Sequence, residues 1–201
     1  MKKIKSSFTN MVVVLMLVAL ITGGLLAFVN QMTEKSIKMQ AEKALAEGIQ
    51  KVMGGKDVVV TKTETVSLKA DNGKKTSCVV HHLSDTKGQQ LGAAVESMTL
   101  GFSGDLKILV GFDTKGDILG YTILETSETP GLGAKADVWF QEGSKGSIIG
   151  KNPARDRLGV KKGGEGVVDA ITASTITSRA FLKAVNQAYA AYRQKVSGSK
   201  N

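Results

Sequence analysis

The chain has 201 residues, of which 42% are hydrophobic and 22% charged, which excludes an intrinsically disordered protein. The net charge of +9 is compatible with nucleic-acid binding, but only 5% of the residues are aromatic and no basic helix carries interleaved aromatics. We therefore expect no nucleic-acid partner.

The single cysteine, Cys78, excludes an internal disulfide and a Cys-x-x-Cys redox pair. His81 and His82 are adjacent in an expected strand and point to opposite faces, so no metal site is expected.

The amino terminus has the pattern of a membrane anchor. Lys2, Lys3 and Lys5 precede an apolar run of 19 residues, 11–29, which reaches the length of a bilayer-spanning helix when it is extended to Phe8. Lysines before the span place the amino terminus in the cytoplasm and the rest of the chain outside. A cleavable secretory signal is the alternative, but this run is longer than the usual signal core. We expect a single-pass protein of the inner (cytoplasmic) membrane, in contact with lipid.

The rest of the chain shows strand patterns between two helical patterns. Apolar residues at helical spacing predict a helix over 31–53, interpreted as a stalk, and a closing helix over 176–196. Strands between helices predict an α+β domain with a mostly antiparallel sheet. The spacing of the polar residues supports no catalytic triad and no pair of catalytic carboxylates. The expected strands are 58–66, 77–80, 91–100, 106–112, 118–124 and 167–171, with a turn at 71–73. The expected parts are the cytoplasmic end and anchor 1–30, the helical stalk 31–55, the domain 56–196 and the polar tail 197–201.

A small-residue loop follows the fifth expected strand. It reads Glu128-Thr129-Pro130-Gly131-Leu132-Gly133, and 131–136 matches the Gly-x-Gly-x-x-Ala pattern of dinucleotide sites. Six residues separate the strand from Gly131 and no β-α-β series surrounds it, so we reject a nicotinamide site. Two interpretations remain: a type II Pro-Gly turn, or a loop whose backbone packs against a flat ligand with Leu132 as an apolar cap.

A run of hydroxyl residues precedes the closing helix. Five hydroxyls lie within seven residues, more than helix capping requires. A helix amino terminus attracts anions, and Arg179 adds a counter-charge, so the run is a candidate attachment site for a phosphate-bearing cofactor. Asp169 is either a loop residue or a determinant read by a modifying enzyme. The five hydroxyl residues are Thr172, Ser174, Thr175, Thr177 and Ser178.

These motifs, together with the anchor, resemble the covalent FMN-binding domain family, in a layout most similar to the RnfG subunits of Rnf electron transport complexes. The resemblance covers the anchor and 92–196, including Gly101-Phe102-Ser103-Gly104. It implies that a flavin transferase esterifies FMN to the last threonine of a Ser/Thr-Gly-Ala-Thr motif, which is Thr175 here. Ala173 replaces the usual glycine and Ser174 the usual alanine, which makes Ser174 a rival acceptor.

The same resemblance implies a set of site residues. Thr129 and Leu132 would lie against the isoalloxazine ring, and Asp169 would be read by the transferase. The full expected FMN site is Thr172, Ser174, Thr175, Ile176, Thr177, Glu128, Thr129, Pro130, Gly131, Leu132 and Gly133.

The function implied is that of an electron-transfer subunit rather than a stand-alone enzyme. It would relay electrons through covalent FMN in an Rnf-type ferredoxin:NAD oxidoreductase complex coupled to Na⁺ or H⁺ translocation. Its partners would be the other membrane subunits, and Gly23 and Gly24 would allow close helix packing. The alternatives are an exported non-redox binding module, the related C subunit of a Na⁺-pumping quinone reductase, and a stand-alone flavin reductase.

Overall fold

The computed structural model describes residues 8–69, 75–161 and 166–197. The chain separates into two compact units, 1–43 and 44–201. Three predicted features lie outside the described residues: the lysines that precede the anchor, the turn at 71–73 and the end of the polar tail.

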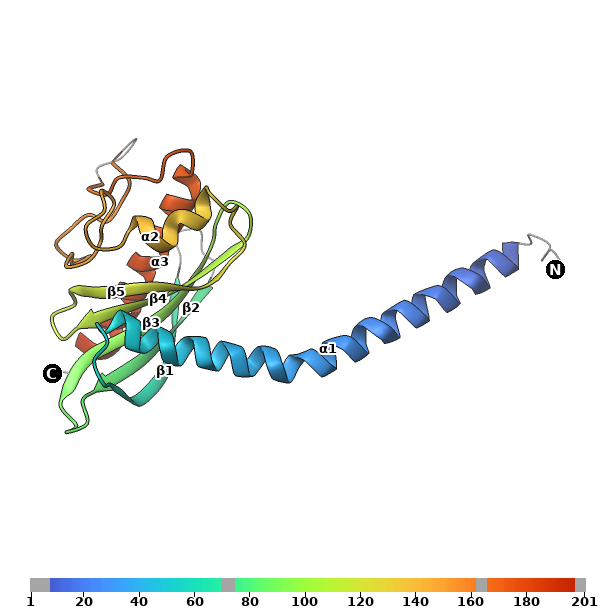
Figure 1. The fold of residues 1–201 in the computed structure, drawn as a ribbon, viewed down its shortest axis with the longest axis horizontal. Coiled ribbons are helices and arrows are strands. Elements are labelled where there is room, and N and C mark those ends of the chain that lie inside the picture. The colour runs from blue at the N-terminus through green and yellow to red at the C-terminus, as the bar shows by residue number, and fades with distance from the viewer. Residues whose placement is uncertain (1–7, 70–74, 162–165, 198–201) are drawn as a thin grey trace. The chain divides into compact units, whose positions relative to one another are not determined.

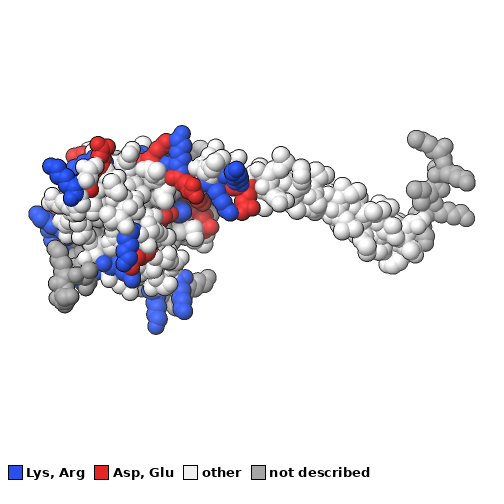
Figure 2. All heavy atoms as spheres, turned by 90° about the horizontal axis from the view of Figure 1, so that it is seen from below, with Lys and Arg blue, Asp and Glu red and all other residues white. Residues whose placement is uncertain are grey.

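Helix α1 (Phe8–Val52) is continuous and joins the predicted anchor to the predicted stalk. Most of this helix belongs to the first unit. Within the described part of the chain it is the one helix long and apolar enough to cross a membrane. Its amino-terminal half carries no charged side chain (Figure 2). The Thr22 hydroxyl donates to the Val18 carbonyl at 2.8 Å, and Thr33 donates to Val29 at 2.9 Å. These polar groups are thus satisfied within the helix, as an apolar surrounding requires.

The second unit is built on a five-stranded sheet whose strands pair in chain order, each antiparallel to the next (Figure 1). This confirms the predicted α+β class with an antiparallel sheet. The second strand is longer than the predicted 77–80 at both ends, and within it His81 and His82 each bond a carboxylate. The strands are β1 (Val59–Lys69), β2 (Lys75–Ser84), β3 (Gln90–Leu100), β4 (Asp105–Asp113) and β5 (Ile118–Thr126).

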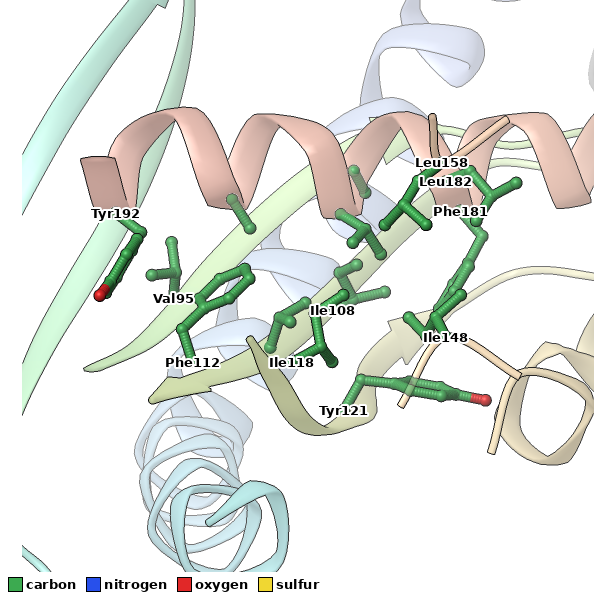
Figure 3. Close-up of a cluster of buried hydrophobic side chains, with 14 of the residues drawn as sticks. Val95, Ile108, Phe112, Ile118, Tyr121, Ile148, Leu158, Phe181, Leu182 and Tyr192 are labelled. Carbon is green, nitrogen blue, oxygen red and sulfur yellow. The ribbon is translucent and has the colours of Figure 1, made fainter. Parts of the chain in front are cut away.

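One face of the sheet packs against α3 (Thr175–Tyr192), which is followed by a π-helical turn, Arg193–Ser197. Figure 3 shows the main core between this helix and the strands. Phe181 is fully buried there, stacked on Phe140 with 4.3 Å between ring centroids and edge-on to Tyr121 at 4.8 Å. Burial of these aromatic rings fixes α3 to the sheet and so determines where its first turn lies.

The opposite face is covered by the carboxyl-terminal end of α1. Ile49, Val52 and Met53 pack there with Leu83, Ala94 and Leu109 of the sheet. The approach is close because two glycines, Gly111 and Gly120, are paired directly between β4 and β5. A Cβ atom would lie 2.6 Å from the Val52 carbonyl oxygen at Gly111 and 2.9 Å from it at Gly120. No larger residue allows this helix end to lie flat on the sheet.

Two features differ from the sequence prediction. The expected strand at 167–171 is wrong: within the described residues this segment forms only one isolated parallel bridge, between Val160 and Val168. The pairing ends there because the next carbonyl, that of Asp169, accepts the Trp139 indole N–H at 2.8 Å instead of a strand partner. Two short helices that the sequence did not predict follow the small-residue loop: η1 (Gly133–Lys135) and α2 (Ala136–Trp139).

Candidate functional site

The fold brings the two predicted motifs together around one cavity of about 390 Å³. Three segments form it: the β3–β4 hairpin, the loop before η1 and the first turn of α3, which lie at the same end of the sheet (Figure 1). Its walls combine exposed apolar side chains with hydroxyl groups. The lining residues are Phe102, Glu128, Thr129, Leu132, Gly133, Ala173, Ser174, Thr175, Ile176 and Thr177.

Most of the predicted site residues line this cavity, and a few do not. Pro130, Gly131 and Thr172 are outside the lining. Asp169 is also outside it, and its carboxylate pairs with Lys161 at 2.9 Å. Arg179 lines a separate cavity of about 420 Å³ further along α3.

Sequence reasoning did not place Phe102 or Ala173 in the site. Phe102 lies in the Gly101–Gly104 segment, which the resemblance had singled out without assigning it a role. The sequence signal for Phe102 was an aromatic residue in a tight hairpin turn. In the structure this residue is 68% exposed, as a ligand-facing apolar residue can be.

The loop before η1 has the geometry of the predicted Pro-Gly turn. Gly131 has a φ of 77°, and the Leu132 N–H donates to the Thr129 carbonyl at 3.2 Å, as in a type II turn. The turn leaves the Leu132 side chain 43% exposed at the cavity wall. The turn and the ligand-facing interpretation are therefore compatible, because the turn is what presents Leu132.

A buried tyrosine holds α2, the helix that follows the loop and η1. The Tyr121 hydroxyl donates to the Ala136 carbonyl at 2.6 Å and accepts the Phe140 N–H at 3.2 Å. Burial raises the pKa of Tyr121 well above its ordinary value. The Trp139 indole N–H donates to the Asp169 carbonyl, which ties α2 to the chain that leads into α3. The hydrogen bonds of Tyr121 and Trp139 thus tie α2 to β5 and to the chain that leads into α3.

Glu128 joins the motifs directly. Its side chain is buried, with 6% exposure. Oε1 accepts the Phe102 N–H at 2.6 Å, and Oε2 accepts the Thr177 hydroxyl at 2.8 Å. One carboxyl group therefore bridges the β3–β4 hairpin and the first turn of α3 from a position in the loop between them.

The hydroxyl run has several separate roles. Ser174 precedes the helix without a side-chain capping bond, whereas the buried Ser178 donates to the Ser174 carbonyl at 2.9 Å and accepts the Ile171 N–H at 2.9 Å. Thr177 is committed to Glu128. Structure thus accounts for two of the five hydroxyls. Thr175 is half-buried at the cavity, while Ser174 is 7% exposed.

Ala173 has an unusual backbone conformation. Its φ is 61°, and it is the only non-glycine residue with positive φ among the described residues. This left-handed conformation costs an alanine about 1 kcal/mol or more relative to glycine. The glycine that the covalent FMN-binding family usually carries at this position suits the same backbone without strain.

The other candidate groups lie away from the cavity. Cys78 is buried, and burial raises the pKa of its thiol. His81 bonds Thr63 and Glu96, whereas His82 bonds Glu64. Across 8–69, 75–161 and 166–197, no cluster of three or more His, Cys, Asp or Glu residues could hold a metal ion.

Comparisons with known proteins point to one family. Residues 101–190 match the FMN-binding domain, and residues 1–52 match the RnfG N-terminal region. The G subunit of the ion-translocating oxidoreductase complex of Shewanella baltica (strain OS223) is 34% identical over 181 residues, covering 87% of this chain and 84% of that protein. The protein of the same name from Yersinia pestis is 35% identical over 179 residues, covering 82% and 80%.

Among solved structures, the NqrC protein of Shewanella oneidensis has a similar fold. The TM-score is 0.54 at 17% sequence identity, and the match covers 80% of this chain and 98% of that chain. At this identity the likeness concerns the fold alone.

Proposed function

This chain belongs to the RnfG family, the G subunits of ion-translocating oxidoreductase complexes, and we propose that it carries FMN covalently on Thr175 and passes electrons within such a complex. The complex would be of the Rnf type, which exchanges electrons between ferredoxin and NAD and moves Na⁺ or H⁺. One observation supports the assignment above all: Thr175 lines a partly apolar cavity at the amino terminus of a long helix.

The cavity suits a flavin nucleotide in size and in chemistry. Its volume of about 390 Å³ falls within the range of small-molecule sites, roughly 300–1,000 Å³. Phe102, Leu132 and Ile176 provide apolar surface for a flat ring, and each is more than 40% exposed in the protein alone. The free N–H groups at the start of α3 favour a phosphate beside Thr175.

The exposure of the hydroxyls favours Thr175 over Ser174 as the acceptor. Thr175 is half-buried, whereas Ser174 is 7% exposed and less open to a modifying enzyme. Attachment requires an activated donor, which we take to be a flavin pyrophosphate such as FAD. The Thr175 oxygen forms a bond to the FMN phosphorus, the pyrophosphate bond breaks, AMP leaves and the hydroxyl proton passes to the transferase or water. Asp169, although outside the cavity, would be read by the transferase.

When bound, FMN supplies one- and two-electron transfer, so the protein needs no acid, base or nucleophile for the redox step. The lining residues contain no His or Cys, and their part is to hold and orient the ring and to exclude water. On the extracytoplasmic side, a loosely held flavin would be lost by dilution. A covalent ester keeps it at a high local concentration.

The lysines before the membrane helix support a cytoplasmic amino terminus with the FMN-binding domain on the other side. Protease added to spheroplasts of cells that produce the protein should degrade the domain without lysis. Full protection of the domain until lysis would overturn this orientation.

In-gel fluorescence tests the covalent attachment. The full-length protein is produced with and without a flavin transferase, as wild type, Thr175→Ala and Ser174→Ala, and then denatured and separated. We expect a fluorescent band for wild type and Ser174→Ala only when the transferase is present, and none for Thr175→Ala. A dark wild-type band would favour the non-redox binding module, and fluorescence of Thr175→Ala would move the attachment to another residue.

A turnover assay tests the relay role. The flavin-loaded protein alone should oxidise NADH at a negligible rate, because other subunits bind that reactant. Rapid turnover by the isolated protein would instead support a stand-alone flavin reductase.

A further inference from the structure

The Glu128 carboxyl group is the point at which three separate segments meet. It lies in the loop before η1, it receives the Phe102 N–H from the β3–β4 hairpin at 2.6 Å, and it receives the Thr177 hydroxyl from α3 at 2.8 Å. The Ser103 N–H also points to Oε1, at 3.4 Å. With both oxygens engaged and 6% of the residue exposed, Glu128 has little surface left for a ligand.

At two glycines, Gly101 and Gly133, a side chain would collide with this carboxyl group. A Cβ atom at Gly101 would lie 2.0 Å from Glu128 Oε1. At Gly133 it would lie 2.3 Å from Oε2 and 2.7 Å from the Thr177 hydroxyl oxygen. The lack of a side chain at Gly133 therefore makes room for the Glu128–Thr177 pair. This gives Gly133 a second role beside the predicted close approach of the loop to a flat ligand.

The bridge controls the part of the cavity where the acceptor lies. Thr177 is two residues from Thr175 in the first turn of α3, so its hydrogen bond restrains the position of the acceptor hydroxyl. Phe102 lines the same cavity, and its N–H is held by the other oxygen. The Glu128 side chain thus links the hairpin that carries Phe102 to the helix turn that carries the acceptor.

We propose that Glu128 is a positioning residue, which sets the separation between the Phe102 wall and Thr175 and so determines how efficiently FMN is attached and how firmly its ring is held. This inference rests on the proposed function. It depends on the reach of the side chain rather than on its charge, because both partners are neutral donors. A glutamine reaches equally far: its carbonyl oxygen accepts the Phe102 N–H, and its amide group can donate to the Thr177 oxygen. An aspartate keeps the charge but is one methylene too short to reach both.

The test compares Glu128→Gln, Glu128→Asp and Glu128→Ala with wild type in the full-length protein. The protein is incubated with FAD and a flavin transferase, and samples are denatured at intervals to measure the rate at which the band becomes fluorescent. We expect Glu128→Gln to stay within about threefold of wild type, and Glu128→Asp and Glu128→Ala to fall about tenfold or more, because misplacing a reacting group by about 1 Å costs that much or more. The matched control is Glu125, an exposed glutamate three residues earlier, changed in the same three ways with no effect expected.

A second readout follows the ring itself. In the protein that does become labelled, visible circular dichroism of the flavin should be weaker in Glu128→Asp than in Glu128→Gln, because the ring is less firmly held. A merely structural role would not move this signal at equal folded fraction. The reverse order of the two variants, or rates of all three equal to wild type, would overturn the inference.

Two further outcomes separate this inference from the proposed function. An unlabelled wild type contradicts the proposed function itself, whereas a labelled wild type with unaffected Glu128 variants contradicts only the positioning role. Thermal unfolding of each variant shows whether it folds. If Glu128→Asp and Glu128→Ala do not fold, Thr177→Val keeps the carboxyl group and removes one arm of the bridge, and attachment at the wild-type rate in that variant would count against the inference.

Discussion

The buried Thr177 hydroxyl donates to Glu128 Oε2 at 2.8 Å, across 49 residues of sequence. This bond connects the loop before η1 with the first turn of α3, the two segments that carry the predicted motifs. Its loss leaves a buried oxygen without its partner, which costs more than the bond itself contributes.

Thr177→Val keeps the shape of the side chain and removes the donor. We expect the free energy of unfolding to fall by about 1–2 kcal/mol, because one buried carboxyl oxygen loses its partner. Thr177→Ser, which keeps the hydroxyl, should lose less. Thr172→Val is the matched control, since Thr172 is exposed and such changes stay within about 0.5 kcal/mol. Denaturant unfolding of the detergent-solubilised protein measures all three, and equal values for Thr177→Val and Thr172→Val would contradict the bridge.

Gly101→Ala and Glu128→Ala should be strongly non-additive. Alone, Gly101→Ala forces a methyl group onto Oε1, a form of overpacking that costs about 1–3 kcal/mol. In a Glu128→Ala background that oxygen is absent, and we expect the added cost to fall below about 1 kcal/mol. The four proteins of this cycle are compared by unfolding in denaturant. Additive costs would show that Gly101 is constrained by something other than the carboxyl group.

Ala173→Gly should stabilise the protein. A φ of 61° strains alanine by about 1 kcal/mol or more, while glycine adds about 0.4–1 kcal/mol of unfolded-state entropy, so we expect a net gain of about 0.5 kcal/mol. Ala190→Gly, at an exposed position inside α3, should instead lose about 1 kcal/mol. Thermal unfolding measures both variants. A higher thermal midpoint for Ala173→Gly and a lower one for Ala190→Gly would support the left-handed conformation of Ala173. A loss at both positions would contradict it.

The pH dependence of stability should show an alkaline fall that involves Tyr192. Burial, and then the neighbouring Asp113, raise the pKa of Tyr192 from 10.0 to about 12. The folded state therefore favours the neutral phenol, and this contribution is present below pH 10 and lost as the pH rises from 10 through 12. The stability lost over this range is at most a few kcal/mol.

Tyr192→Phe checks this dependence. It removes the hydrogen bond to the Asp113 carbonyl and lowers stability at neutral pH by about 1 kcal/mol. It should also make the fall above pH 10 shallower. The fall should not vanish, because burial raises the pKa of Tyr121 as well. An unchanged alkaline slope in Tyr192→Phe would contradict the assignment.

Periodicity was sufficient to predict the five strands and the closing helix, because each packs against a core, whereas the first part of α1 was predicted from its apolar run. It failed at 167–171, where Val168 and Ile171 are buried as in a strand although the backbone pairs only once. A side chain from α2, that of Trp139, takes the next carbonyl, and no local pattern indicates such a long-range bond.

The site was predictable to the level of its two motifs and no further. Hydroxyl count and glycine spacing identified the segments, and the fold brings them to one cavity. The count alone did not separate Thr177 and Ser178, which serve the structure, from Thr175 at the cavity wall. Nor did the sequence indicate that Gly101 and Gly133 surround a carboxyl group, because that contact depends on three segments far apart in the chain.

Mass spectrometry of the tryptic peptide 163–179, from protein isolated from its natural host, tests the central claim most directly. The peptide should carry one FMN as a phosphoester, and fragmentation should place it on Thr175. A Thr175→Ala protein from the same host should yield the unmodified peptide. A wild-type peptide found without flavin, or with the flavin on Ser174, would contradict the account.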